Sequence, residues 1–276
     1  MRRALPALWI AALVLGARPT AAVQTRPELW VSAVRFYRPD KKQTMVKVLV
    51  QVPYASNGYT MAVRVTDSTG QTIQQQSWAK RTLRSVRPGS CGLELLDFAL
   101  APGKHRLEVA VTDSSAGTRA EAAMDLVGFS EPPPASDLML APLMRAATEA
   151  DTVPRSGELR RGNILIAATA HPTITPERSQ VYYLLEVYST RPDSGTLVVG
   201  VADSAGQTLG RTPPSSVRLD AGGAVLRSHI DLGGLAPGEY TLAVELQIDG
   251  GPIWRSAAFS VLGPEAGTPA SCQIRD

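Results

Sequence analysis

Apolar and polar residues alternate along most of this chain. From 107 to 111 every second residue is Leu or Val, and the residues between them are Glu and Ala. A period of two puts alternate side chains on opposite faces, so this pattern predicts an antiparallel strand with one face in a core. The segments 46–52 and 61–65 alternate in the same way. Only residues 142–150 are expected to form a short helix.

The pattern occurs in two copies. Residues 67–73, Asp-Ser-Thr-Gly-Gln-Thr-Ile, return as residues 203–209, Asp-Ser-Ala-Gly-Gln-Thr-Leu. Residues 100–107, Leu-Ala-Pro-Gly-Lys-His-Arg-Leu, return as residues 235–242, Leu-Ala-Pro-Gly-Glu-Tyr-Thr-Leu. The offsets, 136 and 135 positions, differ by one residue, and this constancy indicates one structural unit repeated in tandem.

Turn signals separate about seven expected strands in the first copy and about eight in the second. The sequence therefore predicts an all-β chain of two tandem immunoglobulin-like or fibronectin-like antiparallel β-sandwiches. We expect the first sandwich at residues 23–130 and the second at 137–262, joined by a proline-rich linker at 131–136.

The second copy is longer than the first at its front. Residues 143–163 predict a polar, charged loop inserted before an apolar strand, and long loops on rigid scaffolds often carry binding function. The last residues, 263–276, are predicted to be a disordered tail.

The first 22 residues have the parts of a secretory signal peptide. Arg2 and Arg3 precede an apolar stretch at 4–16, and small residues at 20–22 form an exit. The apolar stretch is shorter than the roughly 20 residues of a membrane span. We therefore expect cleavage near Val23 and a periplasmic or extracellular protein with no transmembrane span once the signal is removed.

The basic character of the chain comes from this leader. The full sequence has 28 Lys and Arg against 25 Asp and Glu, but the leader holds Arg2, Arg3 and Arg18 and no acid. The remainder is balanced and shows no basic stripe, so no nucleic-acid partner is expected. The pair Arg160-Arg161 is interpreted as a solvated strand end.

The histidines give no catalytic or metal-binding pattern. His105 takes the place that Tyr240 holds in the second copy, where a Tyr could form a tyrosine corner, so we predict a structural corner for both. His171 precedes a proline, and His229 is expected to face outward. The sequence thus predicts no catalytic residues, no cofactor and no metal site.

The Asp-Ser-x-Gly-Gln turns lack the alternating acidic ligands of a calcium loop. Asx-turn geometry accounts for Asp67 and Asp203 without a metal.

Cys91 and Cys272 leave alternatives open. In an oxidising compartment they could form a disulfide that ties the tail to the first copy, or they could remain free or pair between molecules.

Exposed aromatic residues could form a sugar platform. The candidates are Trp30, Trp78, Trp254 and the pair Phe36-Tyr37. Because Trp78 and Trp254 fall in predicted strands with one face in the core, we expect these two to be buried.

Three segments carry a family resemblance. Leu29 to Arg38 (Leu-Trp-Val-Ser-Ala-Val-Arg-Phe-Tyr-Arg), Asp137 to Leu140 and Tyr183 to Tyr188 resemble the region upstream of the GWxTD domain in bacterial GWxTD-domain proteins. The resemblance covers about residues 29–262 and implies export and a tandem β architecture. The chain has no Gly-Trp-x-Thr-Asp sequence, so no activity of that domain is implied.

The sequence therefore favours an exported, non-enzymatic envelope protein that acts as a structural or protein-interaction scaffold. A sheet edge or the 143–163 loop would contact an envelope protein partner. The alternative is a carbohydrate-binding module of the cell envelope that uses exposed aromatics. A third hypothesis is an enzyme of unrecognised type that relies on Asp or Glu residues.

Overall fold

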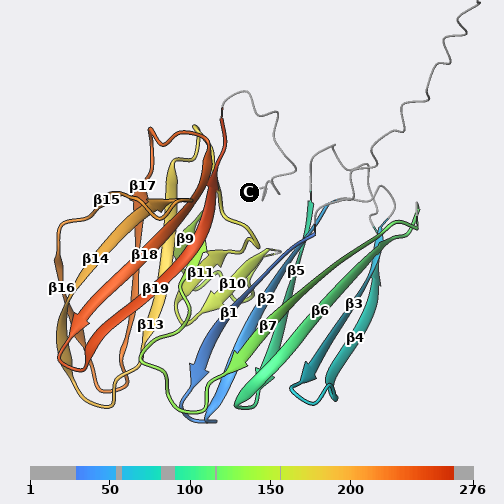
Figure 1. Ribbon diagram of the computed structural model, residues 1–276, viewed down its shortest axis with the longest axis horizontal. Coiled ribbons are helices and arrows are strands. Elements are labelled where there is room, and N and C mark those ends of the chain that lie inside the picture. The colour runs from blue at the N-terminus through green and yellow to red at the C-terminus, as the bar shows by residue number, and fades with distance from the viewer. Residues whose placement is uncertain (1–28, 54–57, 82–90, 116, 156, 264–276) are drawn as a thin grey trace, which may run out of the picture.

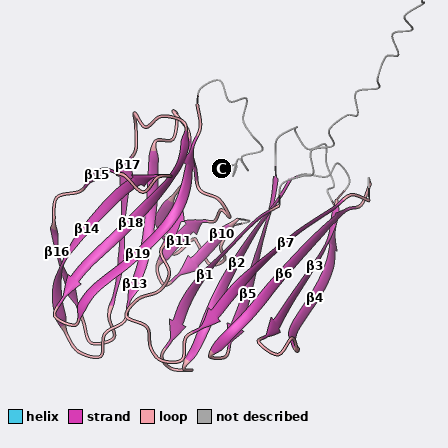
Figure 2. Ribbon diagram, in the orientation of Figure 1, coloured by secondary structure: helices cyan, strands magenta, loops and turns pink. Residues whose placement is uncertain are grey.

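The computed structural model describes residues 29–53, 58–81, 91–115, 117–155 and 157–263. The regular secondary structure in these ranges consists entirely of β-strands, as Figure 2 shows. The all-β, antiparallel sandwich fold that the alternation predicts is confirmed. The described part of the chain contains no helix with the length and apolarity that a membrane crossing requires.

The first sandwich consists of two sheets that enclose one apolar core. One sheet has the order β1-β2-β5, and the other has the order β4-β3-β6-β7. The strands are β1 (Trp30–Arg38), β2 (Gln43–Pro53), β3 (Tyr59–Asp67), β4 (Thr72–Lys80), β5 (Cys91–Leu100), β6 (Gly103–Asp113) and β7 (Arg119–Gly128). Val46, Val48 and Val50 of β2 share this core with Leu107 and Val109 of β6. The inward positions predicted from the alternation are thus buried.

The second sandwich repeats this arrangement. The sheet of order β8-β13-β17 corresponds to β1-β2-β5, and the sheet β12-β19-β18-β14-β15, in which β14 also pairs with β16, corresponds to β7-β6-β3-β4. The strands are β8 (Met139–Ala141), β12 (Thr173–Ile174), β13 (Gln180–Val187), β14 (Asp193–Asp203), β15 (Thr208–Arg211), β16 (Ser215–Leu219), β17 (Ala224–Asp231), β18 (Gly238–Ile248) and β19 (Gly251–Val261). The repeat seen in the sequence is therefore also a repeat of strand pairing.

Both copies carry the same bulge. The register between β3 and β4 shifts between Val65 and Thr66, and the register between β14 and β15 shifts between Val201 and Ala202, 136 positions later. A bulge inserted at the same place in both copies is a feature of the repeated unit, because bulges increase local twist and are kept where that twist is needed.

The turn before each bulge is an Asx turn, as the sequence predicts. The Oδ1 atom of Asp67 accepts the backbone N–H of Thr69 at 2.8 Å, and that of Asp203 accepts the N–H of Ala205 at 2.9 Å, each two residues further along the chain. Gly70 and Gly206 have φ angles of +83° and +81°, which favour glycine.

The segment 143–163 contains two short strands, and residues 147–155 between them form no strand or helix, so the predicted loop is present only in part and the predicted helix at 142–150 is wrong. β9 (Met144–Ala146) and β10 (Glu158–Arg161) flank β11 (Ile164–Ala167) in a small sheet of order β10-β11-β9. The apolar strand β11 needs a hydrogen-bonding neighbour on each side, and the polar segments supply them. The described part of the second copy consequently has twelve strands rather than about eight.

A third apolar cluster joins the two sandwiches through this small sheet. Val34 and Phe36 of β1 and Leu49 of β2 point away from the first core and pack with Ile164 and Ile166 of β11. From the second sandwich the cluster also includes Met139, Ala141 and Leu184. Figure 1 shows β9, β10 and β11 between the two sandwiches. The sheet β1-β2-β5 is therefore covered on both faces.

Ion pairs reinforce the junction. The guanidinium of Arg35 in β1 binds both carboxylate oxygens of Asp137, at 2.8 Å each, and the backbone N–H of Asp137 donates to the carbonyl of Arg35 at 3.0 Å. The carboxylate raises the pKa of Arg35. A two-point contact of this kind fixes orientation as well as distance.

A second polar group lies deeper in the junction. Glu186 of β13 is buried and accepts hydrogen bonds from Arg161 of β10 at 2.6 Å and from the Tyr188 hydroxyl at 3.0 Å. The Tyr188 oxygen in turn accepts the backbone N–H of Tyr37 at 2.8 Å. The guanidinium carbon of Arg161 lies 4.6 Å from the centre of the Phe36 ring. Arg161 is thus a junction residue, and its interpretation as a solvated strand end is wrong.

The end of the predicted linker belongs to the packing of the second sandwich. Ala135 and Ser136 are fully buried. The N–H of Ser136 donates to the carbonyl of Glu186 at 2.8 Å, and Arg255 of β19 donates to the carbonyl of Ser136 at 2.8 Å. These residues are therefore anchored to the second sandwich rather than solvated.

Leu49→Ala tests whether the junction contributes to the stability of the fold. Leu49 is 1% exposed and faces the second sandwich. We expect the variant to lose about 2–5 kcal/mol in free energy of unfolding, measured by urea denaturation, because the substitution leaves a cavity in the cluster. Val225→Ala, at an exposed position of β17, is the control and should change stability by no more than about 0.5 kcal/mol. Equal effects of the two substitutions would contradict the packing described.

Candidate functional site

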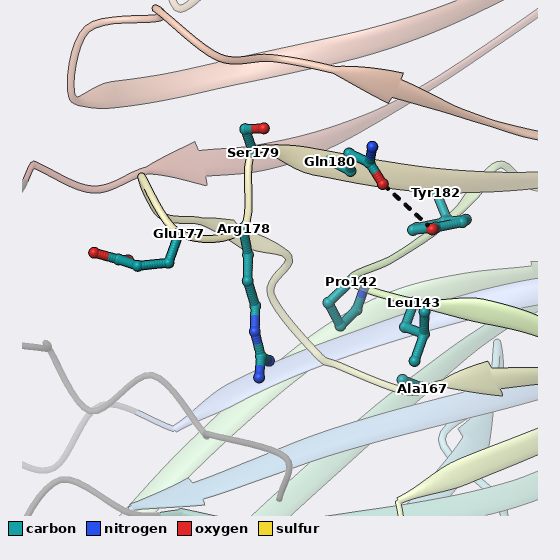
Figure 3. A pocket seen from close by; sticks show the side chains of 8 residues that line it. All are labelled: Pro142, Leu143, Ala167, Glu177, Arg178, Ser179, Gln180 and Tyr182. Atoms are coloured by element: carbon teal, nitrogen blue, oxygen red, sulfur yellow. Dashed lines mark hydrogen bonds between the residues drawn. The ribbon is translucent and has the colours of Figure 1, made fainter. Parts of the chain in front are cut away.

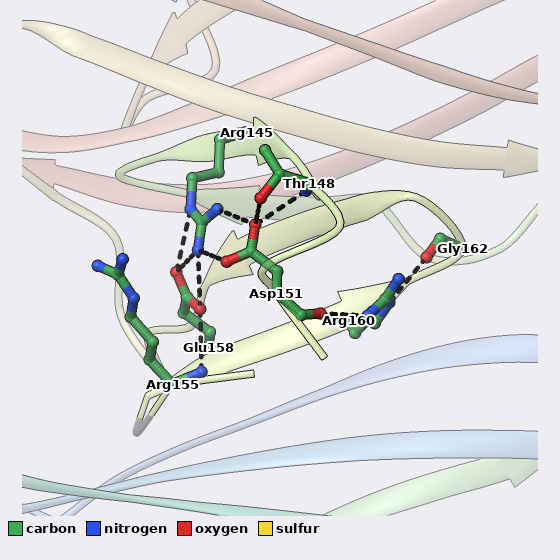
Figure 4. Close-up of polar contacts among 7 residues, drawn as sticks. All are labelled: Arg145, Thr148, Asp151, Arg155, Glu158, Arg160 and Gly162. Atoms are coloured by element: carbon green, nitrogen blue, oxygen red, sulfur yellow. Dashed lines mark hydrogen bonds and ion pairs between the residues drawn. The ribbon is translucent and has the colours of Figure 1, made fainter. Parts of the chain in front are cut away.

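The small sheet β10-β11-β9 is held together by a network centred on Arg145 (Figure 4). Arg145 of β9 binds Asp151 through two hydrogen bonds of 2.8 and 2.9 Å and binds Glu158 of β10 at 3.1 Å. Thr148 donates to Asp151 from its backbone N–H at 2.9 Å and from its hydroxyl at 2.7 Å. One guanidinium therefore joins two strands and the segment between them.

These contacts engage both carboxylates. The hydrogen bonds from Arg145, and after them those from Thr148, hold the pKa of Asp151 well below its usual range, and both carboxylates raise the pKa of Arg145. Asp151 and Glu158 are the kind of neighbouring acids that the enzyme hypothesis requires. Because both are neutralised by the same arginine, the arrangement favours bracing of the insertion over proton transfer.

A cavity of about 430 Å³ opens where this insertion meets the second sandwich. Pro142, Leu143 and Ala167 form its apolar side, and Glu177, Arg178, Ser179, Gln180 and Tyr182 form the other side. Figure 3 shows these side chains. The volume lies within the range of small-molecule sites in proteins.

The cavity walls are fixed by the surrounding backbone. The N–H of Ala167 donates to the carbonyl of Leu143 at 2.9 Å, and Thr175 and Arg178 exchange backbone hydrogen bonds of 3.3 and 2.9 Å. Tyr182 lies on β13, between β8 and β17, and its ring centre is 5.3 Å from that of His229. The cavity is therefore preformed, and we take it as the candidate binding site.

An open sheet edge is a second candidate for interactions. β4 pairs with β3 on one side, and no described residue pairs with its other side. From Gln74 to Lys80 the pairing with β3 is regular. Lys80 is the one charged side chain of β4, and it is paired with Glu94 of β5 at 2.7 Å. Unpaired backbone groups along such an edge are a template for another strand.

The corresponding edge of the second sandwich is interrupted. β15 ends at Arg211, and Thr212-Pro213-Pro214 separates it from β16. Prolines lack the N–H that a partner strand would bind, and they are a common means of protecting sheet edges. Pro213 corresponds to Ser77 of β4 at the offset of 136. The two copies thus differ in whether this edge is open.

His105 and Tyr240 occupy equivalent places at the sandwich corner. The Nε2 atom of His105 lies 2.9 Å from the carbonyl oxygen of Ala101, and the Tyr240 hydroxyl donates to the carbonyl of Ala236 at 2.6 Å. Both contacts reach back four residues, across the Pro-Gly turn. His105 is 6% exposed, and its Nδ1 has no hydrogen-bond partner among the described residues. The corner role stays the interpretation that these contacts support.

His171 and His229 lie on different segments of the second sandwich. His229 is exposed on β17, as expected. His171 contacts the Ser260 hydroxyl through Nε2, and its ring lies edge-on to Trp30 of β1, with 3.7 Å between ring centres. Ser260 donates to Glu239 at 2.5 Å. The serine hydroxyl thus lies between the imidazole and the carboxylate, whereas a nucleophilic triad has the histidine between the other two groups.

The predicted aromatic platform is not assembled. Phe36 and Tyr37 are buried, and Trp30 and Trp78 are partly buried against the apolar clusters. Trp254 is 56% exposed on the outer face of β19, so the expectation that it is buried is wrong. Its backbone lies within a strand, but its side chain is on the face opposite the core, a register that the strand pattern alone did not fix.

Several predictions concern residues outside the described ranges. The signal peptide at 1–22 and Cys272 lie there, as do all but the first residue of the predicted tail at 263–276. The backbone of Cys91 begins β5. Pairing of Cys91 with Cys272 stays a prediction.

Sequence reasoning did not find the cavity. Its lining comes from three separate segments, 142–143, 167 and 177–182, which no motif links. The available signal was the turn Thr-Pro-Glu-Arg at 175–178, a polar segment directly before an apolar strand. No group of three or more His, Cys, Asp or Glu residues in the described part of the chain is placed to hold a metal ion.

Comparisons with known proteins do not assign this chain to a family. No family model and no curated protein matches this chain. Solved structures with a similar arrangement include red sea bream transglutaminase, with 9% sequence identity over 87% of this chain and 32% of that chain and a TM-score of 0.28. Another is the BSP domain of a biofilm-associated protein, with 9% identity, 87% and 53% coverage and a TM-score of 0.26.

A third is Escherichia coli alpha-2-macroglobulin activated by porcine elastase, with 11% identity, 86% and 22% coverage and a TM-score of 0.31. The chain spans less than two thirds of the length of each of these structures. At these identities and TM-scores the likeness carries no argument about function. The resemblance to GWxTD-domain proteins stays a prediction.

Asp151→Asn tests the bracing role of the Arg145 network through pH. A carboxyl whose pKa is lowered by folding stabilises the fold above its unfolded pKa of about 4, and this contribution is lost as the pH falls through its folded pKa. We expect the wild-type urea midpoint to fall more between about pH 5 and pH 2 than that of the variant, which should be less stable near pH 7.

Glu149→Gln provides the matched control, because Glu149 is an exposed acid of the same insertion with no side-chain hydrogen bond to a described residue. Its pH profile should follow the wild type. Parallel profiles for wild type and Asp151→Asn would show that the network does not brace the fold.

Proposed function

We propose that this chain is an exported, non-enzymatic protein of the bacterial cell envelope that binds a partner protein along the open edge of β4. Export is supported by the signal-like leader. A role in binding rather than catalysis is supported by the way the neighbouring acids Asp151 and Glu158 are both engaged by Arg145. The partner would add an extended segment to the sheet β4-β3-β6-β7.

The observation that carries this proposal is the difference between two copies of one unit. Both copies have the same sheet, the same Asx turn and the same bulge, but only the second has prolines in this edge strand. An unprotected edge promotes aggregation, so keeping one open is costly unless it is used. The proline pair shows that the same unit accommodates a protected edge.

The same comparison indicates which backbone groups would bind the partner. The N–H of Thr212 donates to the carbonyl of Val199. The corresponding pair in the first copy is Gln76 and Val63, which are register partners. Because hydrogen-bonding direction alternates along a strand, the N–H of the next residue, Ser77, points away from β3. Ser77 therefore lies at the centre of the available edge.

Ser77→Pro should remove partner binding without removing a hydrogen bond between β3 and β4. With a photo-reactive amino acid at Gln75, we expect a cross-linked adduct in the envelope of the native cell that is retained in Ser77→Ala and reduced about tenfold or more in Ser77→Pro. Circular dichroism and urea midpoints verify that both variants fold. An adduct of equal yield in Ser77→Pro, or no adduct at all, would overturn the proposal.

A second candidate function, carbohydrate binding, is favoured by Trp254. The register partner of Trp254 is Glu245, whose carboxylate accepts hydrogen bonds from Gln247, at 2.8 Å, and from Arg211. An exposed indole beside planar polar groups is suited to stacking on a sugar ring and binding its hydroxyls. This surface lies on the second sandwich, apart from β4.

Fluorescence titration with soluble cell-wall glycan fragments tests this second function. If a sugar stacks on Trp254, the emission should shift on titration, and Trp254→Ala should abolish the shift while Trp78→Phe retains it. A shift that survives in Trp254→Ala would place the sugar elsewhere, and no shift with any fragment would remove this candidate.

A further inference from the structure

We infer that the cavity between the insertion and the start of β13 is a binding site for a carboxylate that carries a small apolar group. This site lies on the second sandwich and is separate from the edge of β4, so the inference does not depend on the proposed protein contact. The argument rests on one available cation, an apolar wall and a pair of loosely engaged polar groups.

Arg178 supplies the cation. Its side chain makes no hydrogen bond or ion pair with any described residue, whereas Arg35, Arg145 and Arg161 each bind a carboxylate of this chain. Figure 3 shows the guanidinium of Arg178 extending past the apolar side of the cavity, while Glu177 points away from it. The neighbouring acid therefore does not neutralise the arginine, and an anion from outside can bind it.

The apolar wall selects the rest of the ligand. Pro142, Leu143 and Ala167 face the side of the cavity opposite Gln180 and Tyr182. Leu143 is 43% exposed, so it has apolar surface that a ligand in the cavity can cover. An aliphatic group of a few carbon atoms would gain burial there.

Two polar groups remain available beside this wall. The Tyr182 hydroxyl lies 3.4 Å from the amide oxygen of Gln180, which is a long hydrogen bond. Both groups can exchange this weak contact for a better one with an amide of the ligand. Ser179, in contrast, hydrogen-bonds Asp231 and lowers its pKa, so it is already engaged.

The ligand that satisfies all three features has a carboxylate for Arg178, an aliphatic group for Leu143 and, next to them, an amide for Gln180 and Tyr182. The C-terminal residue of a peptide ending in a small aliphatic side chain has this chemistry. A free branched-chain carboxylic acid has the first two features and lacks the amide. Guanidinium and carboxylate match in planar, two-point geometry.

The test is NMR titration of the ¹⁵N-labelled full chain with three probes of the same aliphatic group. N-acetyl-leucine has carboxylate and amide, 4-methylpentanoate has the carboxylate alone, and N-acetyl-leucinamide lacks the carboxylate. We expect N-acetyl-leucine to bind in the millimolar range and to shift amide signals at 143, 167 and 178–182. The amide probe should bind about tenfold more weakly or not at all.

Arg178→Gln should weaken N-acetyl-leucine about tenfold or more, and Arg191→Gln, at an exposed arginine of the second sandwich outside the cavity, should leave the affinity unchanged. Equal binding of 4-methylpentanoate and N-acetyl-leucine would assign the site to free carboxylic acids. Equal binding of N-acetyl-leucinamide, full affinity in Arg178→Gln, or shifts at other residues would overturn the inference.

Discussion

The fold depends on burying both faces of the sheet β1-β2-β5. Its inner face lies in the first core, while its outer face carries Val34, Phe36 and Leu49, which a two-layer sandwich would leave in water. The insertion of the second copy covers this outer face with Ile164 and Ile166. The hydrophobic effect thus makes the two sandwiches and the small sheet between them one packed unit.

This junction also determines where surfaces remain available. The polar contacts of the junction are ion pairs, so these charged groups stabilise the junction and are already engaged. The pairs are Arg35 with Asp137 and Arg161 with Glu186. β4 lies at the far side of the first sandwich from the junction, as Figure 1 shows, and no described residue pairs with its outer edge. The cavity lies where the braced insertion meets the second sandwich, and the side chain of Arg178 there makes no hydrogen bond or ion pair with a described residue.

Comparing the two copies of the sandwich distinguishes the features that both copies share from those found in one copy. The turn at Asp67 and Asp203, the bulge after it and the corner contact at His105 and Tyr240 occur in both copies. These features belong to the sandwich itself. Among the described residues, the open edge, the inserted sheet and the cavity each occur in one copy, and the proposed partner edge and ligand site are two of these features.

The sequence by itself determined the tandem repeat and most of the strands outside the insertion, together with the inward faces of strands such as β6. The strands and their inward faces follow from local alternation and turn chemistry, which act within a few residues, so positions such as Leu107 and Val109 were predictable. The repeat follows from matching segments at a constant offset. The repeat also paired His105 with Tyr240 before any contact was known.

Only the tertiary structure decided the role of the insertion, the exposure of Trp254 and the existence of the cavity. The sequence of residues 143–163 is typical of a solvated loop because many of its side chains are polar or charged. In the fold, Arg145 pairs with Asp151 and Glu158, and these contacts require β9 and β10 to flank β11. The cavity unites residues about 40 positions apart. Contacts at such separation depend on how sheets pack, and local sequence patterns carry no record of that packing.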